Sequence, residues 1–522
     1  MANLFPQPCD EGVIRAPQTI APCARVSEPW ILAATILGSS MAFIDGTVVN
    51  VALPALQKNL NATVLDVQWV VESYALFLAA LLLAGGSMGD RFGRRRIFCF
   101  GVALFALASV ACGLAQSIGQ LIAARAFQGI AGALLVPGSL AIISASFDEA
   151  RRGQAIGTWS GFTAITAAIG PVLGGWLIEH ASWRAVFFIN VPLALVVLLI
   201  ALLHVPESRD DDAVTTLDWP GAALATLGLG TLVYGLIESS SLGFSHPLVL
   251  ATLIGGALAL AVFFLVEARS AQPMLPLGLF RSRNFTGANL LTFFLYAALG
   301  GGMFFLPLNL IQVQEYSATA AGAAWLPFIV ILFVLSRWSG GLVQSYGAKV
   351  PLVVGPAIVA LGYGLFMIPA VGGSYWTTFF PAMVVLGLGM AVSVAPLTTT
   401  VMNAVPEKRA GVASGVNNAM SRIGGLLGIA LLGIVVVHSF NRELDRRLAP
   451  LKLSAEIRRD VDAQRVKLAG AEFASNMDQR SRIALKQVID ESFVSGFRLV
   501  MLTSLCLALA SAVVAFVVIE KR

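Results

Sequence analysis

The sequence predicts an all-α protein that crosses a lipid bilayer many times. Of its 522 residues, 57% are hydrophobic and only 12% are charged, and the mean hydropathy is +0.81. A water-soluble fold of this size could not bury so much apolar surface in a core. The apolar residues also lie in runs of about 20, the length that a helix needs to cross the hydrocarbon layer. These two observations indicate a polytopic membrane protein.

Fourteen of the apolar runs are candidate transmembrane helices. They begin near residues 30, 69, 97, 120, 154, 184, 218, 247, 285, 318, 351, 375, 409 and 494. With this count the short connections on one side hold only Lys58 and Arg184, whereas most Lys and Arg residues fall on the other side with the chain ends. By the positive-inside rule, both termini are therefore expected in the cytoplasm.

The second half of the chain repeats the first at an offset of about 254 to 258 residues. Gly86 and Gly93 recur as Gly340 and Gly347, for example. We therefore expect two six-helix halves, the build of transporters whose substrate site lies between the halves. The predicted parts are a cytoplasmic segment (1–29), a first bundle (30–204), a linker with two inserted helices (205–270) and a second bundle (285–522).

The first span contains an acidic residue at membrane depth. Asp45 lies fifteen residues after Trp30, which is about 22 Å along a helix from the predicted cytoplasmic end. Burying its charge costs about 2.5 to 3.5 kcal/mol, so we expect it to face a polar cavity or a partner. A proton or cation site is the favoured interpretation, and a carboxyl group that serves helix packing is the alternative.

Arg125 in the fourth span is the expected partner of Asp45. Counted from the outer ends of their helices, the two residues differ in depth by only about 6 Å. A direct or water-bridged ion pair is within reach, and movement of the guanidinium would change the proton affinity of the acid. Glu72, in the second span, is another carboxylate at membrane depth, with either an interfacial role or a role in coupling.

The connection between the second and third spans reads Gly-Ser-Met-Gly-Asp-Arg-Phe-Gly-Arg-Arg-Arg from Gly86 to Arg96. Its glycines permit close helix packing, its arginines favour the cytoplasmic side, and Asp90 can face a helix N-terminus. We expect a tight cytoplasmic turn that acts as a conformational latch. The residues assigned to it are Gly86, Asp90, Arg91, Gly93 and Arg94.

The fifth span is rich in glycine. A stripe of small residues lets two helices approach closely, and a Gly-Pro step kinks a helix. The residues expected to serve this packing are Gly157, Gly161, Gly170, Pro171, Gly174 and Gly175.

Residues 440–491 do not resemble a membrane span. Charges of both signs alternate with apolar residues at helical spacing, which predicts an external segment of amphipathic helices between the last two spans. It is either a solvated cap or a docking surface for lipid or for a partner such as a periplasmic adaptor protein.

Other classes of site and partner are not indicated. The five cysteines show no CxxC spacing and do not cluster with the four histidines, so neither a metal site nor a disulfide framework is expected. The net charge of +5 is explained by the cytoplasmic loops and does not indicate nucleic-acid binding.

Together these segments resemble the fourteen-span drug/proton antiporter branch of the major facilitator superfamily, the EmrB/QacA type. The resemblance is carried by Asp45 to Pro54, the Asp90 loop, the Arg125 helix, Gly170-Pro171, Trp183-Arg184 with Asn190-Val-Pro192, and Gln314 to Gly322. It implies the major facilitator fold, with two six-helix bundles and two inserted central helices.

The resemblance also implies roles for individual residues. Asp45 would be the proton-linked acid, Arg125 its coupled base, and Asp90 a latch on the N-terminus of the thirteenth span. The thirteenth span departs from some relatives because it has no acid. It carries instead the candidate substrate-cavity residues Asn417, Asn418 and Arg422. Specificity for multivalent cations is therefore not expected.

The predicted function is proton-coupled export of amphipathic or hydrophobic compounds, from a bacterial inner membrane and with no cofactor other than protons. Neutral or zwitterionic cargo fits best, since exchange of a proton for a monovalent cation cancels the electrical driving force. Close alternatives are an exporter of one metabolite and the inner-membrane subunit of a tripartite pump. A membrane-embedded enzyme or signalling protein is a more distant one, because no constellation of catalytic residues lies at interfacial depth.

Overall fold

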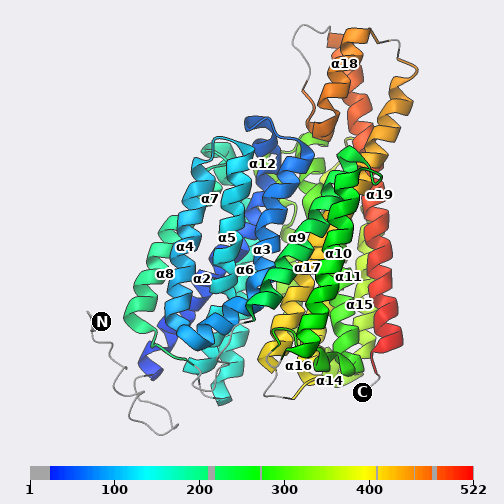
Figure 1. Cartoon of the computed structure of the whole chain (residues 1–522). Helices are drawn as coiled ribbons and strands as arrows, with labels where there is room; N and C mark the ends of the chain where they lie inside the picture. Colours follow the sequence, from blue (N-terminus) through cyan, green and yellow to red (C-terminus); the bar gives the residue numbers. More distant parts are fainter. Residues whose placement is uncertain are drawn as a thin grey trace.

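The computed structural model describes residues 24–147, 149–209, 218–270, 273–406, 410–451, 453–472 and 479–520. Within these ranges the regular structure is entirely helical (Figure 1). Most of the predicted N-terminal segment (1–29) and the last two residues lie outside the described residues.

The first half of the chain forms a bundle of long helices. Two of its helices begin at side-chain caps: Thr63 and Asp66 form a capping box at the start of α3, and Ser117 caps α5. The elements are α2 (Ala24–Asn59), α3 (Val64–Phe92), α4 (Arg94–Leu114), α5 (Ile118–Ser146), α6 (Glu149–His180), α7 (Ala185–Phe188) and α8 (Asn190–His204).

Two helices, α9 (Trp219–Leu242) and α10 (Pro247–Arg269), stand between the halves in the chain. They pack against each other, and α9 also touches α3 of the first half and α17 of the second. Leu76, Val233 and Leu426 are buried together at this junction. The inserted pair therefore covers one side of the seam between the two halves.

The second half forms another bundle. Near the end of α11 the helix widens into the π turn η2. The elements are η1 (Leu277–Arg281), α11 (Arg283–Leu308), η2 (Asn309–Val313), α12 (Ala318–Ala323), α13 (Leu326–Gly340), α14 (Leu342–Tyr346), α15 (Lys349–Leu365), α16 (Tyr375–Asn403), α17 (Ala410–Leu448), α18 (Ala455–Gln464), η4 (Arg465–Gly470) and α19 (Gln479–Val518).

Twelve segments of the described chain are long and apolar enough to cross a bilayer, so the expected fourteen are not all confirmed. Eleven of the twelve begin within five residues of a predicted start, and the last, Gln479–Val518, begins fifteen residues before the predicted start near 494. The two starts left over fall on α6, a helix of 32 residues, and on α15, an apolar helix of only 17 residues. The start of α2 and the end of α19 lie at the same end of the bundle, which requires an even number of crossings (Figure 1).

The residues 440–451, 453–472 and 479–491 form a projection that we call the cap. They were expected to form a separate segment between the last two spans, but α17 and α19 run on from the bundle into it (Figure 1). These two helices pack against each other, and η4 contacts both of them and α18. Leu448, Val461 and Leu485 are buried inside it, each at most 2% exposed. The amphipathic residues at 440–448 and 479–491 are thus the extensions of two transmembrane helices, α17 and α19.

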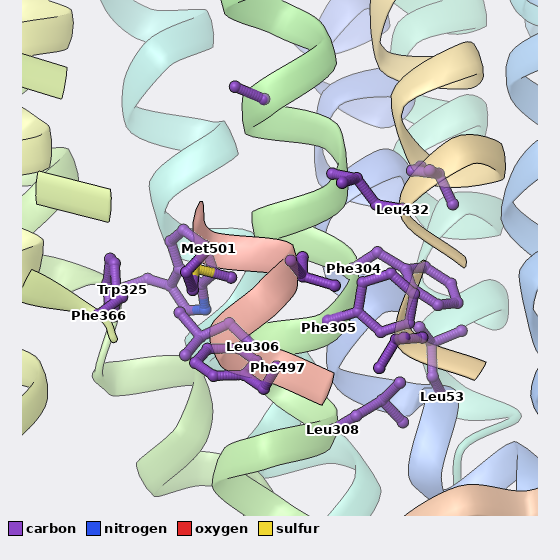
Figure 2. Close-up of a cluster of buried hydrophobic side chains, with 14 of the residues drawn as sticks. Leu53, Phe304, Phe305, Leu306, Leu308, Trp325, Phe366, Leu432, Phe497 and Met501 are labelled. Atoms are coloured by element: carbon purple, nitrogen blue, oxygen red, sulfur yellow. The ribbon is translucent and has the colours of Figure 1, made fainter. Parts of the chain in front are cut away.

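The two halves are packed together at the cap end of the bundle. Leu53 of α2 belongs to the same buried cluster as Phe304 and Phe305 of α11 (Figure 2). Gln312 Nε2 donates to Gln57 Oε1 across the halves at 2.8 Å. The bundle is therefore closed toward the cap.

Some of the glycines in α6 allow the close helix packing that closes the bundle toward the cap. A Cβ on Gly175 would lie 2.3 Å from the carbonyl oxygen of Ala318, and a Cβ on Gly322 would lie 2.1 Å from that of Pro171, so α6 and α12 can meet only without side chains there. Gly170 and Gly174 face α2 in the same way.

Gly157 differs from this expectation. A Cβ there would meet nothing within 4 Å, because no neighbouring helix approaches that turn of α6. The surroundings of Gly161 lie outside the described side chains.

Candidate functional site

Asp45 and Arg125 form a buried ion pair in the first half. Asp45, in the middle of α2, has no exposed surface, and Arg125 of α5 is 1% exposed. Arg125 Nη1 donates directly to Asp45 Oδ2. The predicted contact between the two residues is confirmed, whereas their role in proton coupling stays a prediction.

Two amides and a hydroxyl complete the surroundings of the pair. Gln128 Nε2 donates to Asp45 Oδ1 at 2.8 Å, and Asn190 Nδ2 donates to the same oxygen at 3.3 Å. Gln128 Oε1 in turn accepts from Arg125 Nη1 at 2.6 Å. Ser109 Oγ accepts from both amides, at 2.8 and 3.2 Å. The carboxylate therefore has donors on both oxygens without any contact with bulk water.

The guanidinium of Arg125 is held by α3 as well as by α2. Its Nε donates to the carbonyl of Val70 at 3.1 Å, and its Cζ lies 4.2 Å from the ring centroid of Tyr74. This approach requires Gly129, one turn further along α5, because a Cβ there would lie 2.4 Å from the Tyr74 carbonyl. A shift of α2 against α3 and α5 would thus change the distance between acid and base.

Glu72 is a second buried carboxyl group, and the structure gives neither of its oxygens a hydrogen-bond partner. One turn earlier on α3, Gln68 donates to the carbonyl of Ile429 in α17 at 3.2 Å. Glu72 shares that face, so it lies where the two halves meet. Its side chain has no exposed surface, and the choice between an interfacial role and a role in coupling stays a prediction.

In the loop between α3 and α4, Asp90 pairs within its own turn: Arg94 Nη2 lies 2.8 Å from Asp90 Oδ1. Gly93 has φ +107°, a conformation that favours glycine, and a Cβ there would lie 2.7 Å from Glu207 Oε1. Arg91 stacks on the ring of Phe92.

The loop between α3 and α4 is anchored to the segment after α8. Arg94 N donates to the carbonyl of Ser208 at 2.8 Å, and Arg95 N donates to Glu207 Oε1 at 3.0 Å. The helix expected to receive Asp90 starts next to residues 407–409, which lie outside the described residues, so that contact stays a prediction. A Cβ on Gly86 would lie 3.5 Å from Pro137 Cβ, an ordinary contact distance, so the packing described there does not require glycine.

The candidate substrate-cavity residues separate into two groups on α17. Asn417 Nδ2 donates to Asn289 Oδ1 at 3.2 Å and to Thr292 Oγ1 at 2.8 Å, so Asn417 joins α17 to α11. Asn418 is exposed and Arg422 is half-buried, and they share another face because they are four residues apart. Asn417 therefore serves helix packing, whereas Asn418 and Arg422 form no side-chain bond to another helix within the described residues.

Sequence reasoning missed the residues that complete the buried pair. Gln128 could have been found, because it follows Arg125 by three residues and therefore lies on the same face of α5. Ser109 and Asn190 come from helices far away in sequence, and no spacing rule indicates that they meet Asp45. Among the described residues there is no group of three His, Cys, Asp or Glu side chains that could hold a metal ion.

The profile of the Major Facilitator Superfamily matches residues 35–429 of this sequence. The chain belongs to this superfamily. It is therefore a multi-pass membrane protein, in agreement with its twelve candidate spans.

Curated relatives are similar along most of their length. The chain is 34% identical to the tetracenomycin C resistance and export protein of Streptomyces glaucescens, over 93% of this chain and 91% of that protein. It is also 34% identical to the multidrug resistance protein Stp of Mycobacterium tuberculosis strain CDC 1551 / Oshkosh, over 91% and 88%. The puromycin resistance protein pur8 of Streptomyces alboniger is 36% identical, over 78% and 81%.

Solved structures with lower identity share the fold. A bacterial homologue of the human lysosomal transporter Spinster, inward-facing and unoccupied, superposes with a TM-score of 0.67 at 18% identity, over 94% of this chain and 97% of that one. The xylose transporter XylE from E. coli, in an inward-open conformation, gives 0.56 at 13% identity, over 94% and 96%.

Proposed function

We propose that this protein is a proton-coupled antiporter that exports amphipathic or hydrophobic small molecules by alternating access. The ion pair of Asp45 and Arg125 carries the proposal. A carboxylate at membrane depth is costly, and here it is neutralised by one base on a different helix. Separation of the pair would favour proton uptake by Asp45, and its re-formation would favour release.

The names of the relatives support the export direction. Tetracenomycin C resistance and export, and multidrug resistance, are the activities for which two relatives that align with more than nine tenths of this chain are named. Adaptable apolar cavities leave little trace in sequence, so several compounds of one chemical class fit the proposal better than a single metabolite.

We further propose that the protein belongs to the fourteen-span branch. In this assignment α6 and α15 also cross the membrane and complete the twelve candidate spans to fourteen. Both lie within the bundle, and both coincide with predicted starts. The positive-inside rule then places the termini in the cytoplasm of a bacterial inner membrane and the cap outside. In this orientation the conformation described is closed to the outside.

The decisive experiment is transport in proteoliposomes with an imposed pH gradient. Asp45→Asn should lose pH-driven accumulation, because an amide cannot take up a proton. It keeps the size of the side chain but leaves the charge of Arg125 unpaired, so expression and substrate binding are measured alongside as the check on folding. Asp460→Asn, at an exposed position in the cap, is the matched control and should transport normally. If Asp45→Asn still accumulates substrate, another group carries the proton, and Glu72 is the first to test.

Topology is tested separately. A reporter fused after Arg522 should be cytoplasmic, and one inserted near Ala469 in the cap should be external. The reverse result would contradict the orientation and with it the assignment of the closed side.

A further inference from the structure

Arg422 differs from the other arginine at membrane depth because it has no partner. Among the described residues no carboxylate forms an ion pair with it, and its guanidinium makes no hydrogen bond; its Nε is buried and unsatisfied. The residue is twelve positions into α17, or about 18 Å from the start of that helix. A cation at this depth is costly and, when retained without a partner, marks a substrate or ion pathway.

The position of Arg422 is central. Its helix, α17, packs against α3 of the first half and against α11 of the second, and the next residue, Ile423, packs against the cluster that contains Leu76 of α3. One turn further along α17, a Cβ on Gly425 would lie 3.9 Å from the carbonyl oxygen of Tyr296 on α11. The phenol groups of Tyr74 and Tyr296 also lie within electrostatic range of the guanidinium. Arg422 therefore lies where the two halves face each other.

The two tyrosines are not equivalent. Tyr74 donates its hydroxyl to the carbonyl of Ala42 at 3.3 Å. Tyr296 is half-buried, and its hydroxyl forms no hydrogen bond within the part of the chain that the structure describes. One cationic group and one hydroxyl donor thus lack an acceptor in the same region. An anionic group would satisfy both.

The neighbouring charges do not supply that anion. Asp45 is already bonded to Arg125, Gln128 and Asn190. Glu72 forms no hydrogen bond or ion pair with Arg422. The region between the halves therefore keeps a net positive charge at Arg422, which attracts an acid and repels a cation.

We propose that Arg422, with the Tyr296 hydroxyl, binds the acidic group of an amphipathic organic anion, so that the exported compounds are weak acids such as carboxylates. This inference rests on the proposed export function and replaces the sequence-based expectation of neutral or zwitterionic cargo. Tyr74 connects the two sites, because its ring lies under Arg125 while its hydroxyl is within electrostatic range of Arg422.

The test uses two probes that differ in one charge, dansylglycine and its uncharged amide. Binding to the purified full-length protein is measured by equilibrium dialysis with equal detergent on both sides. Wild type should bind the acid about 10- to 100-fold more tightly than the amide, the contribution of a charge-assisted hydrogen bond. Arg422→Gln should abolish this preference, Arg422→Lys should retain part of it, and Tyr296→Phe should reduce it by about fivefold.

Arg446→Gln is the matched control, because Arg446 is an exposed arginine of the cap that pairs with Glu443. It should keep the full preference for the acid. Equal binding of the two probes by wild type, no binding of either, or an unchanged preference in Arg422→Gln would overturn the inference.

Transport assays distinguish this inference from the proposed function. Accumulation of the amide alone, driven by a pH gradient, would uphold proton-coupled export and refute the anion site. Binding of the acid that depends on Arg422, without pH-driven transport of either probe, would uphold the anion site and refute proton coupling.

Discussion

The two arginines at membrane depth, Arg125 in the first half and Arg422 in the second, have opposite surroundings. Arg125 is fully buried and bonds to a carboxylate, an amide and a backbone carbonyl. Arg422 is half-buried and bonds to none of the described residues. In a medium of low dielectric constant, a satisfied charge is held in place, whereas an unsatisfied one is available to a ligand. The proposals for the two arginines thus give the two halves different roles: the first half would hold the proton-linked pair, and the second would bind the anionic group of the substrate.

The largest expected effect is on stability at the paired site. Arg125→Ala should lower the free energy of unfolding by about 3 to 5 kcal/mol, because it leaves Asp45 buried without its partner. Arg422→Ala should leave stability nearly unchanged, because no intramolecular bond is lost. Thermal unfolding of the detergent-solubilised variants measures both.

The double variant Asp45→Asn/Arg125→Gln sharpens this result. It removes both charges and should recover most of the lost stability, since neither side chain then has an uncompensated charge. Equal destabilisation by Arg125→Ala and Arg422→Ala would show that the two sites do not differ in this way.

A smaller effect is expected for the amide that bridges the pair. Gln128→Leu removes the donor to Asp45 Oδ1 and the acceptor for Arg125 Nη1, and should cost about 1 to 3 kcal/mol of stability. Asn418→Leu is the control, because Asn418 is exposed and bonds only to the carbonyl of Ser414 in its own helix. If Gln128→Leu were as stable as wild type, the amide of Gln128 would not contribute to the stability of the buried pair.

Tyr74→Leu tests the contact between the two sites. It removes the ring under Arg125, an interaction of about 0.5 to 2 kcal/mol, and should weaken the effect of pH on binding of dansylglycine more than it weakens binding itself. Binding isotherms at two pH values provide the measurement. If pH changed the binding of dansylglycine equally in Tyr74→Leu and in wild type, binding at Arg422 would not depend on Arg125 through this ring.

The smallest effect on stability is expected at the surface pair of Asp90 and Arg94. Its oxygen is partly exposed, so Asp90→Asn should change the free energy of unfolding by only about 0 to 1 kcal/mol. If the residue is a latch, the same substitution still shifts a nearly balanced conformational equilibrium. Cysteine accessibility on the two sides of the membrane would show the shift, and an unchanged ratio would exclude the latch.

Much of the fold was predictable because membrane insertion acts on local sequence. Runs of apolar residues gave the starts of the long helices, and depth along two helices was enough to pair Asp45 with Arg125. Continuation of α17 and α19 into the cap was not predictable, since an amphipathic pattern does not show where one helix ends. The partners Ser109 and Asn190 were hidden because tertiary packing alone brings them to the acid.

Gln57 joins the two halves of the bundle and the cap through one side chain. Its Oε1 accepts from Gln312 in the second half, and its Nε2 donates to the carbonyl of Lys467 in the cap at 3.1 Å. The same three parts line a cavity of about 350 Å³ at the mouth of the bundle. Because the cap is built on the ends of α17 and α19, displacement of α2 away from the second half would break both bonds of Gln57. Each such bond contributes only about 0.5 to 1.5 kcal/mol, so Gln57 favours the closed mouth without preventing its opening.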